Sequence, residues 1–357
     1  MTTCCLFFRR ECRSIDPVKI LIIRFSSFGD VLQSLSIAGA LKRRYPDAEI
    51  HWVTRQEFVP LVETHPGVHK VWAIGRGLSF FGLWQLARTL RAQNFTHVYD
   101  AHNNLRSHVI GWVLKGFLSW RSLIGQVKFL RRSIYRFKRF LLFRFRLNLF
   151  PQPFSGQRAL LEPLEKWNVD IEAPPTPQLF FHAGDIEKVQ SKVPEIKRNR
   201  FISLAPSAAF ELKRWPVEYW KELVQQMPEA HFALLGGPED KFVEEIARVA
   251  PDRVLNLAGR LTLNESAAVV ASSQALVAND TGLMHVAEQI GKPCIALMGP
   301  APFGFPSRKL TKIMEVPLAC RPCSKHGQGP CVNPSFHRCM RDIRPNQVVA
   351  ELRGLLQ

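Results

Sequence analysis

Residues 19–30 read KILIIRFSSFGD, and this stretch decides the fold class. The continuous apolar run at 19–25 is typical of a strand covered on both faces, as in a parallel sheet. A short polar turn follows it, and a helical pattern then extends from Val31 to Arg44. Because the next strand is expected at 49–54, the strand, turn and helix predict a doubly wound α/β domain.

The same alternation continues along the chain and then starts again in its second half. In the first half we expect strands at 68–74 and 97–100 and a helix at 83–93. In the second half we expect strands at 201–205, 231–235, 254–257, 275–278 and 293–298, separated by helices at 217–226, 239–249, 263–272 and 282–290. The sequence therefore predicts two domains of the same architecture.

The segment IEAPPTP at 171–177 separates the two halves. Its prolines cannot continue a helix or a central strand, so we interpret it as a stiff linker. The predicted organisation is a tail at 1–16, an N-terminal domain at 17–172, a C-terminal domain at 173–345 and a last helix at 346–357.

Basic residues are concentrated in one part of the chain. The formal net charge is +18, and residues 101–161 contain twelve Lys and Arg but no Asp or Glu. Residues 128–146 alternate basic with aromatic and aliphatic residues, which predicts a basic amphipathic helix. Such a field attracts phosphates on lipids, glycolipids or nucleic acid, although a solvated basic helix is also possible. The patch that we expect to face an acidic acceptor or a membrane consists of Arg131, Arg132, Arg136, Lys138 and Arg139.

Cysteines gather near the C-terminus. Four of them, Cys320, Cys323, Cys331 and Cys339, lie within twenty residues, a density that suits a structural zinc ion, but their spacing is not that of two CxxC pairs and favours a metal-free loop. No apolar run is long enough to span a membrane, and the N-terminus lacks the features of a secretory signal. We therefore expect a cytosolic protein without a disulfide framework.

An anion site is predicted where residues 275–278 end and NDTGLMH begins at 279–285. The free N–H groups of a helix that starts directly after a buried strand can bind a phosphate. Asp280, Thr281 and Gly282 would form that helix start, and His285 would lie one turn further on. The alternative is an ordinary capped helix with a core histidine.

Three other strand ends carry polar residues. Lys213 lies in a loop after residues 201–205 and could neutralise a leaving diphosphate, or it could be a solvated surface lysine. Asp30 could be a general base or only a residue that complements its helix dipole. Glu239 follows Gly236 and Gly237 and could bind a ribose diol, or it could belong to a plain turn. The motifs of dinucleotide oxidoreductases and P-loop nucleotidases are absent.

The chain resembles the bacterial heptosyltransferases of glycosyltransferase family 9. The resemblance rests on IIRFSSFGDV at 22–31, KRWP at 213–216, LGG at 235–237 and NDTGLMH at 279–285. It implies the GT-B fold, in which two Rossmann-like domains face a cleft and the C-terminal helix returns to the N-terminal domain. It also implies an inverting reaction that requires no metal cofactor, with Asp30 as the base and Lys213 at the diphosphate. The donor contacts that it implies are Ser207, Ala208, Glu239, Asp280, Thr281, Gly282 and His285.

The function we expect is transfer of heptose from ADP-heptose to the Kdo- or heptose-bearing inner core of lipid A. The enzyme would be cytoplasmic and peripheral on the inner face of the inner membrane. A relative of the same fold that uses another nucleotide sugar is the nearer alternative. A non-catalytic nucleic-acid-binding protein is a distant one, because the strand-end residues of both halves would then have no role.

Overall fold

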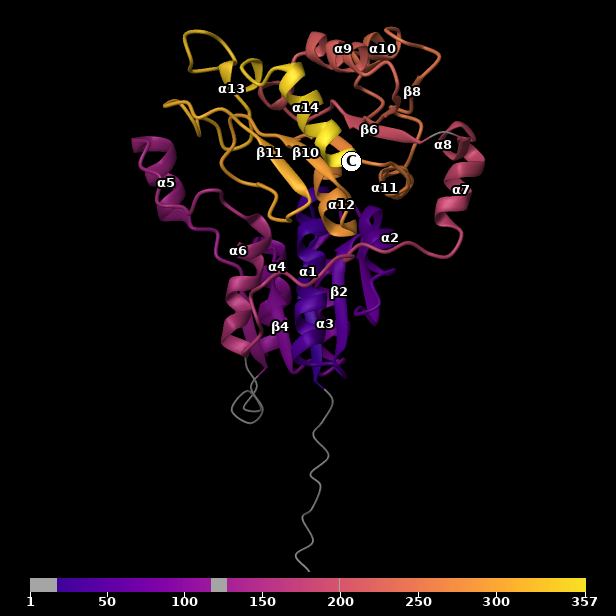
Figure 1. Cartoon of the computed structure of the whole chain (residues 1–357). Coiled ribbons are helices and arrows are strands. Elements are labelled where there is room, and N and C mark those ends of the chain that lie inside the picture. Colours follow the sequence, from indigo (N-terminus) through magenta and orange to yellow (C-terminus); the bar gives the residue numbers. More distant parts are fainter. Residues whose placement is uncertain (1–17, 117–126, 199) are drawn as a thin grey trace, which may run out of the picture.

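The computed structural model describes residues 18–116, 127–198 and 200–357, so the expected tail at 1–16 lies outside it. The described chain forms two sheets, both entirely parallel, and the domain of the second sheet lies above that of the first in Figure 1. The first has five strands in the order β3-β2-β1-β4-β5, and the second has six in the order β11-β10-β9-β6-β7-β8. The segment at 171–182 joins the halves without a helix or strand.

The first sheet has the chain's most apolar strand at its centre. Its strands are β1 (Lys19–Ile23), β2 (Glu49–Arg55), β3 (Lys70–Ile74), β4 (His97–Asp100) and β5 (Lys128–Arg131). Its helices are α1 (Phe28–Arg44), α2 (Val59–Val62), α3 (Phe80–Arg91), α4 (Leu105–Lys115), α5 (Arg136–Phe145) and α6 (Gly156–Leu161). Four residues of β1 are fully buried because helices cover the sheet on both faces.

The second sheet repeats this plan. Its strands are β6 (Phe201–Ala205), β7 (His231–Leu234), β8 (Val254–Asn256), β9 (Leu276–Asn279), β10 (Cys294–Leu297) and β11 (Thr311–Met314). Its helices are α7 (Asp185–Lys192), α8 (Glu195–Arg198), α9 (Val217–Gln226), α10 (Val243–Ala247), α11 (Leu263–Ser272), α12 (Gly282–Ile290), α13 (Arg338–Arg341) and α14 (Pro345–Leu356). One apolar cluster runs through both halves, since it contains Val31 and Leu35 of α1 together with Met284 and Ala287 of α12.

The last helix does not pack where we expected it. Instead of returning to the N-terminal domain, α14 packs on α9 and β10 of the second sheet (Figure 1). Its buried residues Val348, Val349 and Leu352 join the cluster that contains Trp220 and Leu297. The sequence predicts this helix, but the apolar stripe of a helix does not specify which neighbour covers it.

Residues 128–146 are also different from the single helix that we predicted. Residues 128–131 form the edge strand β5, with Tyr99 opposite Leu130, and the helix α5 starts only at Arg136. The predicted helix at 239–249 is likewise shorter, because Asp240 accepts a hydrogen bond from the backbone N–H of Gly237 and holds a turn there. Within the described residues, no helix is long and apolar enough to cross a membrane.

Candidate active site

The two halves meet where α1 packs against α12. Gln33 contacts His285 and Ser36 contacts Gln289, so the two helices run in the same direction. At their first turns, a Cβ placed on Gly29 would lie 2.9 Å from Cδ2 of His285. The N-termini of α1 and α12 therefore lie together, each at the carboxyl edge of its own sheet. Two positive helix ends at one place favour a bound anion.

Asp30 lies in the first turn of α1 and is held on both sides. Its Oδ1 lies 2.8 Å from a guanidinium nitrogen of Arg24, a residue that is itself buried. Its Oδ2 accepts hydrogen bonds from the Ser27 hydroxyl at 2.8 Å and from the Ser27 backbone N–H at 3.3 Å. The carboxylate side chain is 41% exposed, so it is fixed in orientation and still open to a reactant.

The charges around Asp30 keep it ionised. Burial raises its pKa, but the positive charges of Arg24 and Arg132 and the Ser27 hydrogen bonds outweigh burial and hold the pKa well below its ordinary value. The carboxylate is thus present at neutral pH without any proton having to leave first. Arg24 is oriented in turn by a hydrogen bond from its guanidinium to the Ala101 carbonyl at 2.6 Å.

Lys213 and Asp280, predicted from separate motifs, lie together in the second half. The Lys213 ammonium is 2.5 Å from Asp280 Oδ2, and both side chains are largely buried. Asn279 fixes this arrangement, because its amide donates to the Pro206 carbonyl at 2.7 Å and accepts from the Trp215 N–H at 3.1 Å. The loop that carries Lys213 is therefore attached to the end of β9.

His285 and Gly282 are placed differently from the prediction of direct donor contacts. His285 is buried, with Nε2 2.8 Å from the Gln33 amide nitrogen and Nδ1 2.9 Å from Glu288. The space beside Gly282 is filled by the Phe28 ring, with which a Cβ on Gly282 would overlap. Thr281, the residue before α12, is partly exposed and keeps the expected position at the helix start.

The remaining predicted donor contacts lie around the neighbouring strand ends. The Ala208 carbonyl accepts from the Arg214 guanidinium at 2.9 and 3.0 Å, whereas Ser207 Oγ has no hydrogen-bond partner among the described residues. Glu239 is exposed, with its carboxylate folded over Gly237. The buried carboxylate of this turn is its neighbour Asp240, 3.6 Å from Arg214.

The predicted basic patch is divided between the cleft and the surface. Arg131 forms an ion pair with the buried Asp100 at 2.9 Å. Arg132 and Arg139 are close enough to act on the charge of Asp30, and each has a buried Nε without a hydrogen-bond partner in the described chain. Arg136 is exposed and Lys138 partly so. Arg131 is thus a structural ion-pair partner, while a role for Arg132 and Arg139 at the site stays a prediction.

The cysteine-rich loop lies over the Lys213 side of this site. A Cβ on Gly327 would lie 2.7 Å from Cγ of Lys213, and His326 stacks on Phe210 with ring centroids 6.3 Å apart. The thiol of Cys331 accepts from the His337 N–H at 3.2 Å, and that of Cys320 accepts from the Asn333 amide at 3.4 Å. Burial raises the pKa of Cys323, and it raises that of Cys339 to about 12. A zinc ion on these thiols stays a prediction.

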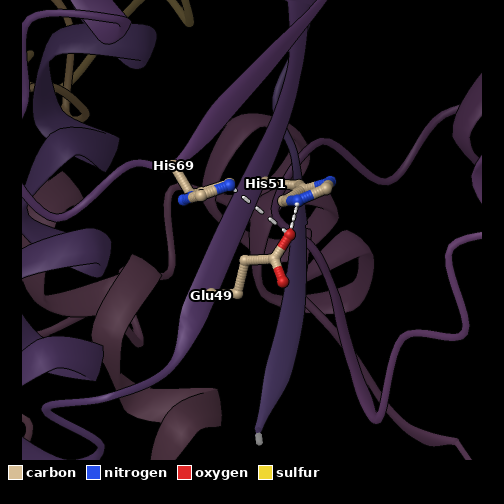
Figure 2. A group of neighbouring side chains, drawn as sticks. All are labelled: Glu49, His51 and His69. Carbon is tan, nitrogen blue, oxygen red and sulfur yellow. Dashed lines mark hydrogen bonds and ion pairs between the residues drawn. The ribbon is translucent and has the colours of Figure 1, made fainter.

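The structure offers a different group of possible metal ligands. Figure 2 shows Glu49, His51 and His69, whose ligand atoms are the one such group within 4.8 Å of one another among the residues described. The Trp72 N–H donates to Nδ1 of His51 at 3.1 Å, so the proton of neutral His51 lies on Nε2 and donates to Glu49 at 2.6 Å. The Lys19 ammonium, 3.0 Å away, already neutralises Glu49. We therefore assign this group to hydrogen bonding at the amino end of β2.

Four residues near the site were not predicted as part of it, although all belong to quoted motifs or loops. They are Arg24, Asn279, Asp240 and His326. A charged residue at the end of an apolar strand was a usable signal for Arg24, because a buried arginine needs a partner. The position of His326 depends on the conformation of a long loop, and that conformation cannot be predicted from residue types alone.

Two Rossmann-like domains that face each other across polar strand ends have the architecture of the GT-B fold. The sequence model of glycosyltransferase family 9 (heptosyltransferase) matches residues 83–332, and the chain belongs to this family. It is 28% identical to lipooligosaccharide heptosyltransferase 2 of Haemophilus ducreyi, over 95% of this chain and 99% of the relative. The enzyme is a glycosyltransferase.

Solved structures show the same fold over nearly the whole chain. The Escherichia coli ADP-heptose lipopolysaccharide heptosyltransferase II superposes with a TM-score of 0.71 at 22% identity, covering 95% of this chain and 98% of that one. A family 9 glycosyltransferase from Veillonella parvula gives 0.73 at 19% identity, with coverages of 95% and 97%.

Proposed function

We propose that this chain is an inverting heptosyltransferase that moves heptose from ADP-heptose to the Kdo- or heptose-bearing inner core of lipid A in lipopolysaccharide. One observation carries the proposal: Asp30 on one half and the Lys213–Asp280 pair on the other lie at the helix ends where α1 and α12 converge. The sugar and the acceptor come from the names of the relatives, which are lipopolysaccharide or lipooligosaccharide heptosyltransferases.

The donor is proposed to bind the C-terminal half. Its diphosphate would lie at the start of α12, where Thr281 and the free N–H groups of the first turn can donate to phosphate oxygens. Lys213 is already held at this helix end by Asp280 and would neutralise the charge that grows on departing ADP. The Ser207 hydroxyl, which has no partner in the part of the chain that the structure describes, offers a further donor, and Glu239 lies at the next strand end for the ribose.

The acceptor is proposed to bind the N-terminal half beside Asp30. Arg132 and Arg139 each have a buried Nε without a hydrogen-bond partner among the described residues, and their guanidinium groups suit the phosphates and carboxylates of an inner core. Asp30 would take the proton of the acceptor hydroxyl. The hydroxyl oxygen would at the same time bond to the anomeric carbon, on the face opposite ADP. The bond from that carbon to the diphosphate breaks, ADP leaves with the electron pair, and the configuration inverts. Arg24 and Ser27 keep the carboxylate aimed at the hydroxyl.

This arrangement supplies positive charge from Lys213 and two helix ends, so we propose that transfer needs no divalent metal. Full activity in excess EDTA is the expected result, and a rate restored only by added Mg²⁺ would contradict it. We also propose that the enzyme works at the inner face of the inner membrane, where a lipid-linked acceptor would meet a nucleotide sugar.

The direct test uses the purified full-length chain with ADP-heptose and lipid A cores that carry Kdo alone or Kdo with one heptose. Transfer to one of these acceptors is expected, with release of ADP. In thermal unfolding, ADP should raise the midpoint while UDP and GDP should not, because a ligand that binds only the folded state stabilises it. Absence of transfer to both acceptors, or stabilisation by UDP alone, would overturn the sugar assignment.

A further inference from the structure

Helices α3 and α4 expose large apolar side chains that the proposed reaction does not use. They are Phe80, Phe81 and Trp84 of α3 and Leu105 and Trp112 of α4, between 43% and 75% exposed. Both helices already bury another stripe on the sheet, which includes Leu83 and Leu90 of α3 and Ile110 of α4. The exposed residues are therefore a second apolar surface, and contiguous apolar surface of this kind marks a site of interaction.

These side chains share one face of the N-terminal half. The two helices pack side by side, and a Cβ on Gly116 at the end of α4 would lie 2.9 Å from the guanidinium of Arg91 at the end of α3. Since their last turns meet and both follow strands of a parallel sheet, their first turns also lie together. Phe80, Phe81 and Leu105 thus lie at the carboxyl edge of the sheet, the edge that also carries Asp30.

The exposed charged residues on this α3–α4 face are all positive. From Gly75 to Gly116 the only carboxylate is Asp100, whose side chain is fully buried. The Lys and Arg residues of the same stretch, Arg76, Arg88, Arg91, Arg106 and Lys115, are all exposed. Exposed Trp and Phe surrounded by Arg and Lys is the pattern of surfaces that insert at the interface of an anionic bilayer.

We propose that the α3–α4 face docks on an anionic lipid bilayer and thereby holds the Asp30 edge close to a lipid-linked acceptor. This role for the surface rests on the proposed function, since docking would bring the active site to its lipid-linked acceptor. Charge complementarity selects the bilayer over a second copy of the chain. A symmetric pairing of two such faces would bring ten like charges together, five from each copy.

The test is co-sedimentation of the purified full-length chain with vesicles of phosphatidylethanolamine and phosphatidylglycerol, and with vesicles of phosphatidylcholine alone. The wild type should bind the anionic vesicles. The combined variant Phe80→Ser, Phe81→Ser, Trp84→Ser should bind them at least about tenfold more weakly, because it loses three aromatic side chains from the interface. The matched control is Phe336→Ser, which removes an exposed aromatic from the C-terminal half and should bind like the wild type.

A second measurement separates this inference from the proposed function. With an acceptor stripped of its acyl chains, the triple variant should transfer heptose at the wild-type rate, whereas with acceptor embedded in vesicles its rate should fall at least about fivefold. If the wild type transfers no heptose at all, the proposed function fails and the vesicle result still stands. Equal vesicle binding by wild type and triple variant overturns the docking surface. So does a wild-type dimer in analytical ultracentrifugation that the triple variant abolishes.

Discussion

The amide nitrogen of Gln33 lies 2.8 Å from Nε2 of His285, so a hydrogen bond between buried side chains joins the central helices of the two domains. Because that amide nitrogen can only donate, His285 accepts there and donates from Nδ1 to Glu288 at 2.9 Å. Glu288 is fixed in turn by the backbone N–H groups of Ser307 and Arg308, at 2.6 and 3.0 Å. This chain of contacts sets the relative position of the residues that the following predictions address.

Replacing Asp30 with Asn should lower kcat by about 10²–10⁴-fold, the usual contribution of a general base. The amide has nearly the same shape but cannot take the acceptor proton. Stabilisation by ADP should be unchanged, because the proposed donor site is on the other half. Asp47→Asn, an exposed carboxylate near the opposite end of α1, is the matched control and should keep the wild-type rate. Full activity of the Asp30 variant would reduce this residue to a helix-dipole role.

Replacing Arg24 with Gln should move the acid limb of the kcat/KM profile to higher pH. Arg24 lowers the pKa of Asp30, and without it the opposing effect of burial would raise that pKa, so that Asp30 becomes protonated earlier as pH falls. The ion pair also stabilises the folded protein above the unfolded carboxyl pKa of about 3.9, and this stability is lost as pH falls through the folded value. A pH profile identical to that of the wild type would show that Arg24 does not lower the pKa of the catalytic base.

Replacing Lys213 with Met should lower kcat by about 10²–10³-fold, as expected for the loss of one charge that stabilises a leaving group. The ammonium lies 2.5 Å from Asp280 at the helix end where the diphosphate is proposed. Steady-state kinetics with ADP-heptose would measure the loss. Lys241→Met removes an exposed lysine from the same half and should have no effect, so equal rates for the two variants would contradict the assignment.

Replacing Gly282 with Ala should cost about 1–3 kcal/mol of unfolding free energy, because the new methyl group would overlap the Phe28 ring. Adding Phe28→Ala should relieve that overlap. The double variant should therefore lose less unfolding free energy than the two single variants lose in total. Urea unfolding measures all three proteins. Gly354→Ala, in α14 where a Cβ meets nothing within 4 Å, should be neutral or slightly stabilising. A strictly additive double variant would show that the two residues are not in contact.

The fold class was predictable because parallel sheets impose a local pattern, a buried strand followed by a helix. The same pattern explains why the strand-end residues Asp30, Lys213 and Asp280 could be selected in advance, since ligands bind at the carboxyl ends of such strands. The contacts that each of these residues makes could not be predicted from the sequence. Two ion pairs, Arg24 with Asp30 and Lys213 with Asp280, depend on the conformation of the loops that carry these residues.

Other features could not be predicted because the sequence signal fits more than one partner. The stripe of α14 could cover either domain, and in the structure it packs on α9 and β10 of the second sheet. Residues 128–131 resemble the helix that follows them, and only pairing with β4 makes them a strand. His285 looked like a donor contact, yet both of its nitrogens are used by Gln33 and Glu288.

The fit between Gly282 and Phe28 has a consequence for recombining these enzymes. The glycine belongs to the donor half and the ring to the acceptor half, so a larger residue in place of the glycine requires a smaller one in place of the ring. A chimera that takes its donor domain from one relative and its acceptor domain from another should assemble only if both parents have a compatible pair at these two positions. Domain shuffling aimed at new sugar specificities must therefore move this pair as one unit.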